Sequence, residues 1–131
     1  MGRMMRMARA TVLSVVGLVC ALVVPAGAQT VVDGTAVGLD PALVQSIERL
    51  VTRDFKAPAE AQIRNLRHSR ARNGHGYCGE VAIGPTAAYV PFHAILEPEG
   101  KPSLLLLSDH DRSVEDKEAA TRLLTNFGCV E

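Results

Sequence analysis

Two cysteines, Cys78 and Cys129, limit the possible folds of this chain more than any other feature. A third, Cys20, lies in an N-terminal segment with the pattern of a cleavable secretory signal. Its removal would leave an even pair in a chain bound for an oxidising compartment, where cysteine pairs form disulfides. We therefore predict a Cys78–Cys129 bridge, closing a loop of about 52 residues and contributing about 4 kcal/mol to stability. A reactive thiol or a soft metal site is the alternative, although the chain has no C-x-x-C pair.

The segment 1–28 carries the three parts of a signal peptide. Basic side chains come first, an apolar run over residues 12–24 follows, and Ala26 and Ala28 form the small-x-small pattern of a cleavage site. The uncharged stretch around this run has about 15 residues, whereas a helix needs about 20 to cross a bilayer. We therefore expect cleavage near Ala28, a periplasmic or secreted protein, and no stable membrane anchor after processing.

Removal of this segment would make the chain acidic. It takes away three of the 14 basic residues and none of the 14 acidic ones, which leaves a net charge near −3 on about 103 residues. A chain of that length forms one compact domain. A negative charge with only 4% aromatic residues argues against nucleic-acid binding. We expect a flexible lead-in over residues 29–39 and a single domain over residues 40–131, of unknown oligomeric state.

Hydrophobic periodicity predicts an α+β fold. One amphipathic helix is expected over residues 41–55, capped by Asp40, and another between Ser113 and Gly128. Strand character is found in residues 63–72, 77–83, 86–96 and 103–108. Pro91 cannot donate a ladder hydrogen bond, which places its strand at an edge or makes it bulge. The expected fold is a three- or four-stranded, mainly antiparallel sheet with an N-terminal and a C-terminal helix that could share one sheet face.

Several short motifs resemble those of a family of small exported proteobacterial proteins of uncharacterised function. They are Lys56-Ala57-Pro58 with Ala61-Gln62-Ile63-Arg64-Asn65, then Tyr77-Cys78-Gly79-Glu80-Val81, Tyr89-Val90-Pro91-Phe92 and Gly128-Cys129. The family pattern runs roughly as D-P-x-S-A-x-F-R-N, then C-G-x-V-N. This chain has Ala57 in place of the aspartate and Ala82 in place of the asparagine. The resemblance implies a paired-cysteine domain outside the cytoplasm and brings no known activity with it.

Basic side chains are concentrated in the first predicted strand. If residues 63–72 are extended, one face carries Arg64, His68, Arg70 and Arg72. Such a row can bind phosphate or carboxylate groups of an envelope protein or of an anionic envelope component. The alternative is an edge strand whose charges keep the protein soluble and discourage unwanted pairing.

Acidic residues and histidines supply the candidates for catalysis. Groups used in acid–base or metal chemistry are found at Glu80, at His93 and in the loop Asp109–Asp111. Glu80 is expected to pair with an arginine such as Arg64. A histidine could pair with a serine such as Ser69. The sequence has no serine elbow, no H-E-x-x-H and no phosphate-binding glycine loop. We therefore expect a small exported, non-enzymatic interaction or accessory domain of the cell envelope, without metal or cofactor. The alternative is a small envelope hydrolase or metal-dependent enzyme using Glu80, His93 or the Asp109–Asp111 loop.

Overall fold

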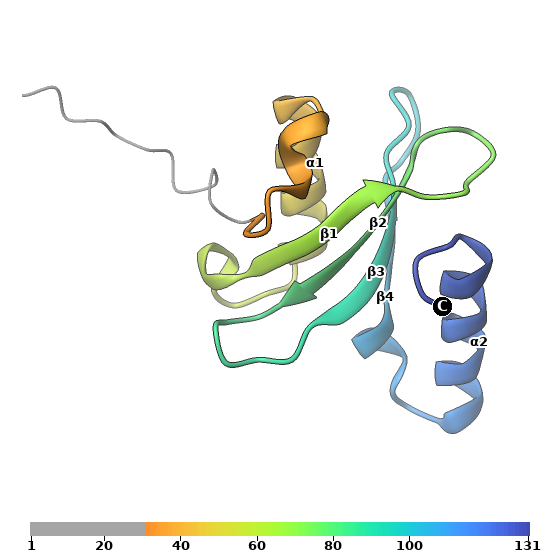
Figure 1. Ribbon diagram of the computed structural model, residues 1–131. Helices are drawn as coiled ribbons and strands as arrows, with labels where there is room; N and C mark the ends of the chain where they lie inside the picture. The colour runs from red at the N-terminus through yellow and green to blue at the C-terminus, as the bar shows by residue number, and fades with distance from the viewer. Residues whose placement is uncertain (1–30) are drawn as a thin grey trace, which may run out of the picture.

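The computed structural model describes residues 31–131, so the predicted signal peptide lies outside the described residues. Four antiparallel strands form one sheet, with a helix on each side of it (Figure 1). This confirms the predicted α+β class, with a four-stranded sheet and one disulfide. Within residues 31–131, no helix is both long enough and apolar enough to cross a membrane.

The strands lie side by side in the order in which they follow one another in the chain. Their order is β1-β2-β3-β4, and their bounds are Gln62–His68, Gly76–Ala82, Val90–Ile95 and Ser103–Leu106. Helix α1, Pro41–Thr52, precedes the sheet, and helix α2, Val114–Asn126, follows it. Short 3-10 turns lie at Thr35–Gly38 (η2), Pro58–Glu60 (η3) and Leu107–His110 (η4).

The two helices cover opposite faces of the sheet, which corrects the expectation that they could share one face. Helix α1 packs on the face that carries Val81 and Phe92, and these elements form the larger core. Helix α2 packs on the other face, where Leu124 lies against the cysteine bridge. Successive residues of a strand point to opposite faces, and β2 is buried along almost its whole length. Both faces of β2 therefore need a cover.

A hydrogen bond marks each end of helix α1. The Asp40 carboxylate accepts a hydrogen bond from the N–H of Ala42 at 3.0 Å, which caps the first turn. Ile47, in the middle of the helix, is fully buried against the sheet. The helix ends at Thr52 rather than at the predicted Phe55. The N–H of Phe55 donates to the Thr52 carbonyl in a turn, and its ring packs against the core from outside the helix.

A β-bulge interrupts β1 between Arg64 and Arg67. Two residues of β1, Asn65 and Leu66, lie opposite the single residue Gly79 of β2. Asn65 has a φ of 56°, in the left-handed region that asparagine tolerates better than most residues. The extra residue moves every later side chain of β1 to the face opposite the one that simple alternation predicts.

Residues 31–39, predicted to belong to a flexible lead-in, are instead held against this bulge. The Asp33 carboxylate accepts a hydrogen bond from the N–H of Asn65 at 2.7 Å. The Thr35 hydroxyl accepts one from the N–H of Leu66 at 2.9 Å. Because a bulge removes ladder partners from the strand, these two side chains satisfy backbone groups that β2 does not reach.

The Asp33 carboxyl is held in its charged form. Partial desolvation raises its pKa, but hydrogen bonds from the N–H of Asn65 and from the hydroxyl and N–H of Thr35 outweigh that effect, so its pKa lies below the ordinary value. A carboxyl with a lowered pKa stabilises the fold above its ordinary pKa and loses that contribution as the pH falls further. The contact with Asn65 is therefore at full strength at neutral pH.

The predicted Cys78–Cys129 bridge is confirmed, with the two Cα atoms 5.0 Å apart. Gly128 follows α2 with a φ of 77°, which glycine adopts without strain, and brings the chain back to β2. The Arg67 guanidinium donates to the carbonyl oxygens of Gly128 and Cys129, at 3.0 and 3.2 Å. One covalent bond and one charged side chain thus fix the C-terminal segment to the sheet.

We predict that Gly79→Ala lowers the free energy of unfolding by about 1–3 kcal/mol, the usual cost of overpacking a core. A Cβ at Gly79 would lie 2.5 Å from the ring of Phe92, which is fully buried. Gly84→Ala is the matched control, because a Cβ there meets nothing within 4 Å. Urea denaturation measures both variants, and an equal stability for the two would contradict this packing.

Candidate functional site

The bulge separates the basic residues that the sequence placed in one row. That row consisted of Arg64, His68, Arg70 and Arg72. Strand β1 ends at His68, so the last two members lie in the loop that follows it. Arg64 pairs with Glu80 and His68 with Tyr77, and these two residues of β2 point to different faces. The predicted common face is therefore wrong, because it assumed uninterrupted alternation.

Arg64 lies in a small polar cluster. One of its nitrogens is 3.3 Å from a Glu80 oxygen, and its guanidinium lies 3.7 Å from the centre of the Tyr89 ring. The Tyr89 hydroxyl donates to the Gln62 side chain at 3.2 Å. This confirms the predicted pairing of Glu80 with an arginine. Both charged groups are partly exposed, so the pair contributes about 1 kcal/mol at most, and the negative charge of Glu80 beside Arg64 makes this place less favourable for an anion.

The structure brings Ser69 and His93 together, with Nε2 2.9 Å from Oγ. His93 is buried and stacks on the Phe127 ring with the centroids 3.8 Å apart. Ser69 Oγ also accepts a hydrogen bond from the N–H of Ala71 at 3.2 Å. Among residues 31–131, no carboxylate is hydrogen-bonded to His93, and burial lowers the pKa of its imidazole. This contact anchors the loop between β1 and β2.

The other acidic candidates have partners of their own. His110, inside the loop Asp109–Asp111, places Nδ1 3.2 Å from an oxygen of Asp116 in α2. In the part of the chain that the structure describes, no three His, Cys, Asp or Glu side chains form a cluster suited to a metal ion. Glu80 contacts Arg64, whereas His93 contacts Ser69. The groups expected to support hydrolysis are thus not gathered at one place.

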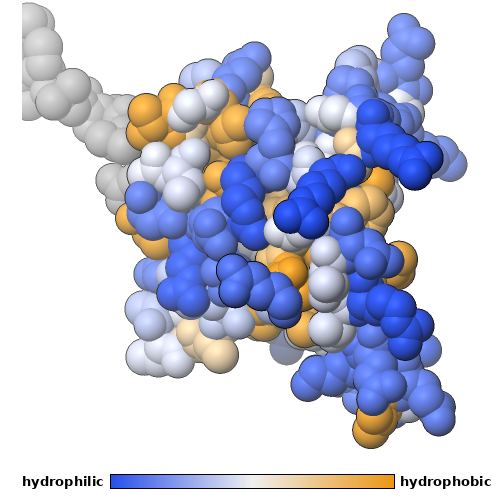
Figure 2. All heavy atoms as spheres, turned by 45° about the vertical axis from the view of Figure 1, so that its right-hand side comes forward, coloured by the Kyte–Doolittle hydropathy of each residue, from blue (hydrophilic) through white to orange (hydrophobic). Residues whose placement is uncertain are grey.

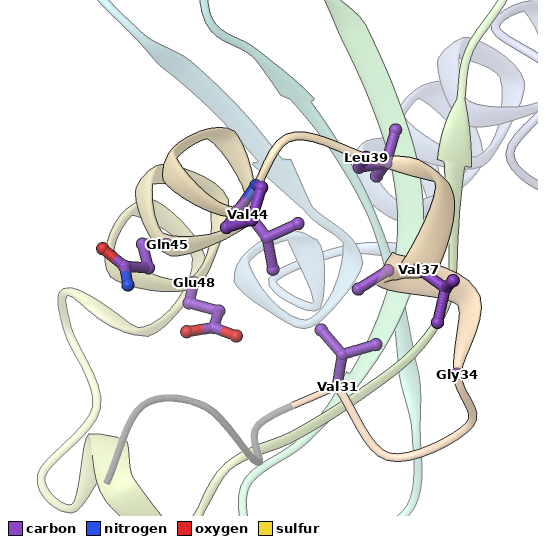
Figure 3. A pocket seen from close by; sticks show the side chains of 9 residues that line it. Val31, Gly34, Val37, Leu39, Val44, Gln45 and Glu48 are labelled. Atoms are coloured by element: carbon purple, nitrogen blue, oxygen red, sulfur yellow. The ribbon is translucent and has the colours of Figure 1, made fainter. Parts of the chain in front are cut away.

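A pocket lies between η2 and α1 (Figure 3). Its volume is about 390 Å³, within the range of about 300–1,000 Å³ that is usual for ligand sites. Its apolar walls are formed by Val31, Ala36, Val37, Leu39 and Val44. Val31 and Val44 point into the space from opposite sides, one from the N-terminal segment and one from the helix (Figure 3).

Two polar side chains of α1, Gln45 and Glu48, lie at the edge of this pocket (Figure 3). Glu48 comes one helical turn after Val44 and therefore lies on the same side of the helix. Its carboxylate makes no ion pair with any side chain among residues 31–131. Desolvation raises the pKa of Glu48, and the nearby charge of Arg49 offsets only part of that effect. The pocket thus combines apolar walls with one partly buried carboxyl.

Apolar side chains are also exposed at the rim of the pocket and beside it. Val37, on η2, is 87% exposed, and Val32 is 50% exposed. Figure 2 shows apolar atoms gathered near residues 31–39 and α1, whereas the surface over α2 is mostly hydrophilic. Apolar surface next to a concave site is typical of a place where a ligand or partner binds.

The pocket could not be predicted from the sequence, because residues 31–39 show neither helical nor strand periodicity. The available signal was Asp33-Gly34-Thr35, a turn in which the Asp33 carboxylate accepts a hydrogen bond from the N–H of Thr35 and Gly34 has a φ of 79°. The sequence alone does not show whether such a turn contacts another element of the fold. Its partner here is Asn65, which lies 32 residues later in the chain.

Comparison with known proteins gives no further guide, since no family model, curated protein or solved structure matches this chain. A function must therefore be inferred from the chemistry of the residues themselves. Of the places described above, the pocket between η2 and α1 combines a concave shape, apolar walls and an ionisable group.

We predict that His93 makes the fold less stable in mild acid. Because burial lowers its pKa, the unfolded chain binds more protons below about pH 6.5, and stability falls with pH by at most about 1.4 kcal/mol per unit. His93→Gln keeps a hydrogen-bonding partner for Ser69 but does not titrate, so its stability should depend less on pH.

Urea denaturation of both proteins between pH 5 and 7.5 tests this prediction. The raised pKa of Glu48 acts in the opposite direction at the acidic end of the range, because a group with a raised pKa favours the folded state as the pH falls. It is present in both proteins and cancels in their difference. Parallel stability curves for the two proteins would rule out this role of His93.

Proposed function

We propose that this protein is a small, exported, non-enzymatic binding domain of the cell envelope, and that the pocket between η2 and α1 receives an apolar group of its partner. The observation that carries the proposal is an apolar cavity of about 390 Å³ between an ordered turn and a helix. Sites for small ligands are usually concave, mostly apolar and largely pre-formed, with a few polar groups that set specificity.

The walls of the pocket are held in place without a ligand. Asp33 and Thr35 fix the N-terminal wall to the bulge in β1, and Asp40 caps the helix that forms the other wall. Binding therefore does not require a loop to become ordered, which would cost free energy and weaken affinity.

The sequence and the bridge support export. Residues 1–28 have the pattern of a cleavable signal, and a Cys78–Cys129 disulfide is compatible with an oxidising compartment. Outside the cytoplasm, small domains commonly depend on such a bridge for their stability.

The contacts of the other candidate groups favour binding over hydrolysis. His93 is buried under Phe127, and Glu80 is paired with Arg64. None of these residues lines the pocket, where Glu48 is the one ionisable side chain contributed by residues 31–131. A negatively charged pocket also makes an anionic ligand a poor fit, since like charges repel.

We predict that n-octanol, a neutral apolar probe, binds the pocket and that Val37→Asp weakens its binding about tenfold, equivalent to about 1.4 kcal/mol. The new carboxylate would place a charge at the apolar entry, while the exposure of Val37 keeps the fold unaffected. Val114→Asp is the matched control, because Val114 is also an exposed valine, 74% exposed, on the helix across the sheet.

Methyl NMR shifts of Val31 and Val44 during an octanol titration measure this binding. Saturable shifts that Val37→Asp weakens and Val114→Asp leaves unchanged would support the pocket as the binding site. The absence of saturable shifts in the wild-type protein would refute the proposed function.

Export has a separate prediction. When the full sequence is expressed in a Gram-negative host and purified from the envelope fraction, the intact mass should correspond to a chain that begins at Gln29 and lacks two hydrogens. A thiol-alkylating reagent should add no mass before reduction and two groups after it, on Cys78 and Cys129. A purified protein that still begins at Met1, or one in which Cys78 and Cys129 are both free thiols, would contradict export.

A further inference from the structure

We infer that the ligand of this pocket carries a protonated amine beside its apolar part, and that Glu48 is the residue that recognises the amine. The inference rests on the proposed binding function, since it specifies the chemistry of the ligand for the same site. A hydrocarbon group would occupy the space between Val31 and Val44, and its ammonium would lie at the α1 edge of the pocket.

The position of Glu48 fits a group that recognises charge. It follows Val44 by one turn, so its side chain borders the same cavity that the valine lines. Arg49, the nearest basic residue in the chain, donates to the Ser46 hydroxyl at 3.3 Å, on the exposed side of the helix. Within residues 31–131, no cation forms an ion pair with the Glu48 carboxylate.

The physical state of this carboxyl favours a cationic partner. A carboxylate that loses hydration without gaining a hydrogen bond is destabilised, and the raised pKa of Glu48 is the expected sign of that loss. An ammonium supplies a charge-assisted hydrogen bond, which is stronger than one between neutral groups. It has three donors and no acceptor. The Glu48 carboxylate can accept at least one of them, and water the others.

Other ligand classes fit less well. A carboxylate or phosphate would be repelled by Glu48, and a neutral hydrocarbon would remove more water from it without replacing a hydrogen bond. A metal ion prefers several oxygen ligands, whereas the described part of the chain has no cluster of three acidic, His or Cys side chains. A primary ammonium on an apolar group is the chemistry that satisfies both parts of the pocket.

The test compares three probes with the same chain length: n-octylammonium, n-octanol and octanoate. The protein is the one purified from full-length expression, and the Val31 and Val44 methyl shifts again report binding. We expect octylammonium to bind about fivefold or more tightly than octanol, and octanoate to bind more weakly than either. Glu48→Gln keeps the size of the side chain and should abolish the preference for the amine while octanol still binds.

Glu60→Gln is the matched control, because Glu60 is an exposed carboxylate on η3 and its removal changes the net charge equally. It should leave the preference intact. If octanol binds but octylammonium has no advantage, or if Glu60→Gln removes the advantage as Glu48→Gln does, this inference is overturned while the proposed function stands. If none of the probes binds, the proposed function fails first.

A fourth probe, leucinamide, distinguishes two sources of the same chemistry. It carries the α-ammonium of a polypeptide terminus beside a branched apolar side chain, whereas octylammonium represents a simple hydrocarbon amine. Glu48-dependent binding that is tighter for leucinamide would assign the site to an amino-terminal residue. Glu48-dependent binding that is tighter for octylammonium would assign it to an amine with a longer chain, and either result supports recognition of the ammonium.

Discussion

In the middle of β1, the backbone N–H groups of two successive residues donate to side chains of the N-terminal segment rather than to the neighbouring strand. Asn65 donates to Asp33 and Leu66 donates to Thr35. This arrangement attaches the N-terminal segment to the sheet, and the attached segment forms one wall of the pocket. The same bulge sends His68 to the face opposite Arg64. One irregularity in one strand thus positions a wall of the pocket and removes the expected row of basic groups.

The elements with strong local signals could be predicted from the sequence. The capped, periodic helix α1, the strand that contains Cys78 and the pairing of the two late cysteines are all present. The predictions that failed depended on partners distant in the chain. Pro91 was expected at an edge or a bulge, yet it lies in an interior strand. It is tolerated there because the ladder between β3 and β4 begins only at Phe92. The pocket was missed for the same reason, since Asp33 finds its partner in another element.

Several residues of the short motifs noted in the sequence occupy positions where the backbone needs particular residues. Gly79 lies under the Phe92 ring, where a Cβ would not fit. Asn65 and Gly128 have left-handed φ angles of 56° and 77°, and Cys78 is completely buried in the bridge. These residues specify how the chain turns and packs. Glu48 and Val37, by contrast, lie outside the motifs, so the pocket is a property of this chain that the motifs do not describe.

The sheet stands between the pocket and the disulfide. Helix α1 and η2 form the pocket on one face, whereas Leu124 and the Cys78–Cys129 bridge lie on the other. The core under α1 includes neither cysteine. The bridge holds the C-terminal segment to β2, whereas none of the residues among 31–131 that line the pocket is a cysteine. The two core clusters meet only through the strands that separate them, so the sheet is the one layer that any effect of the bridge on the pocket must cross.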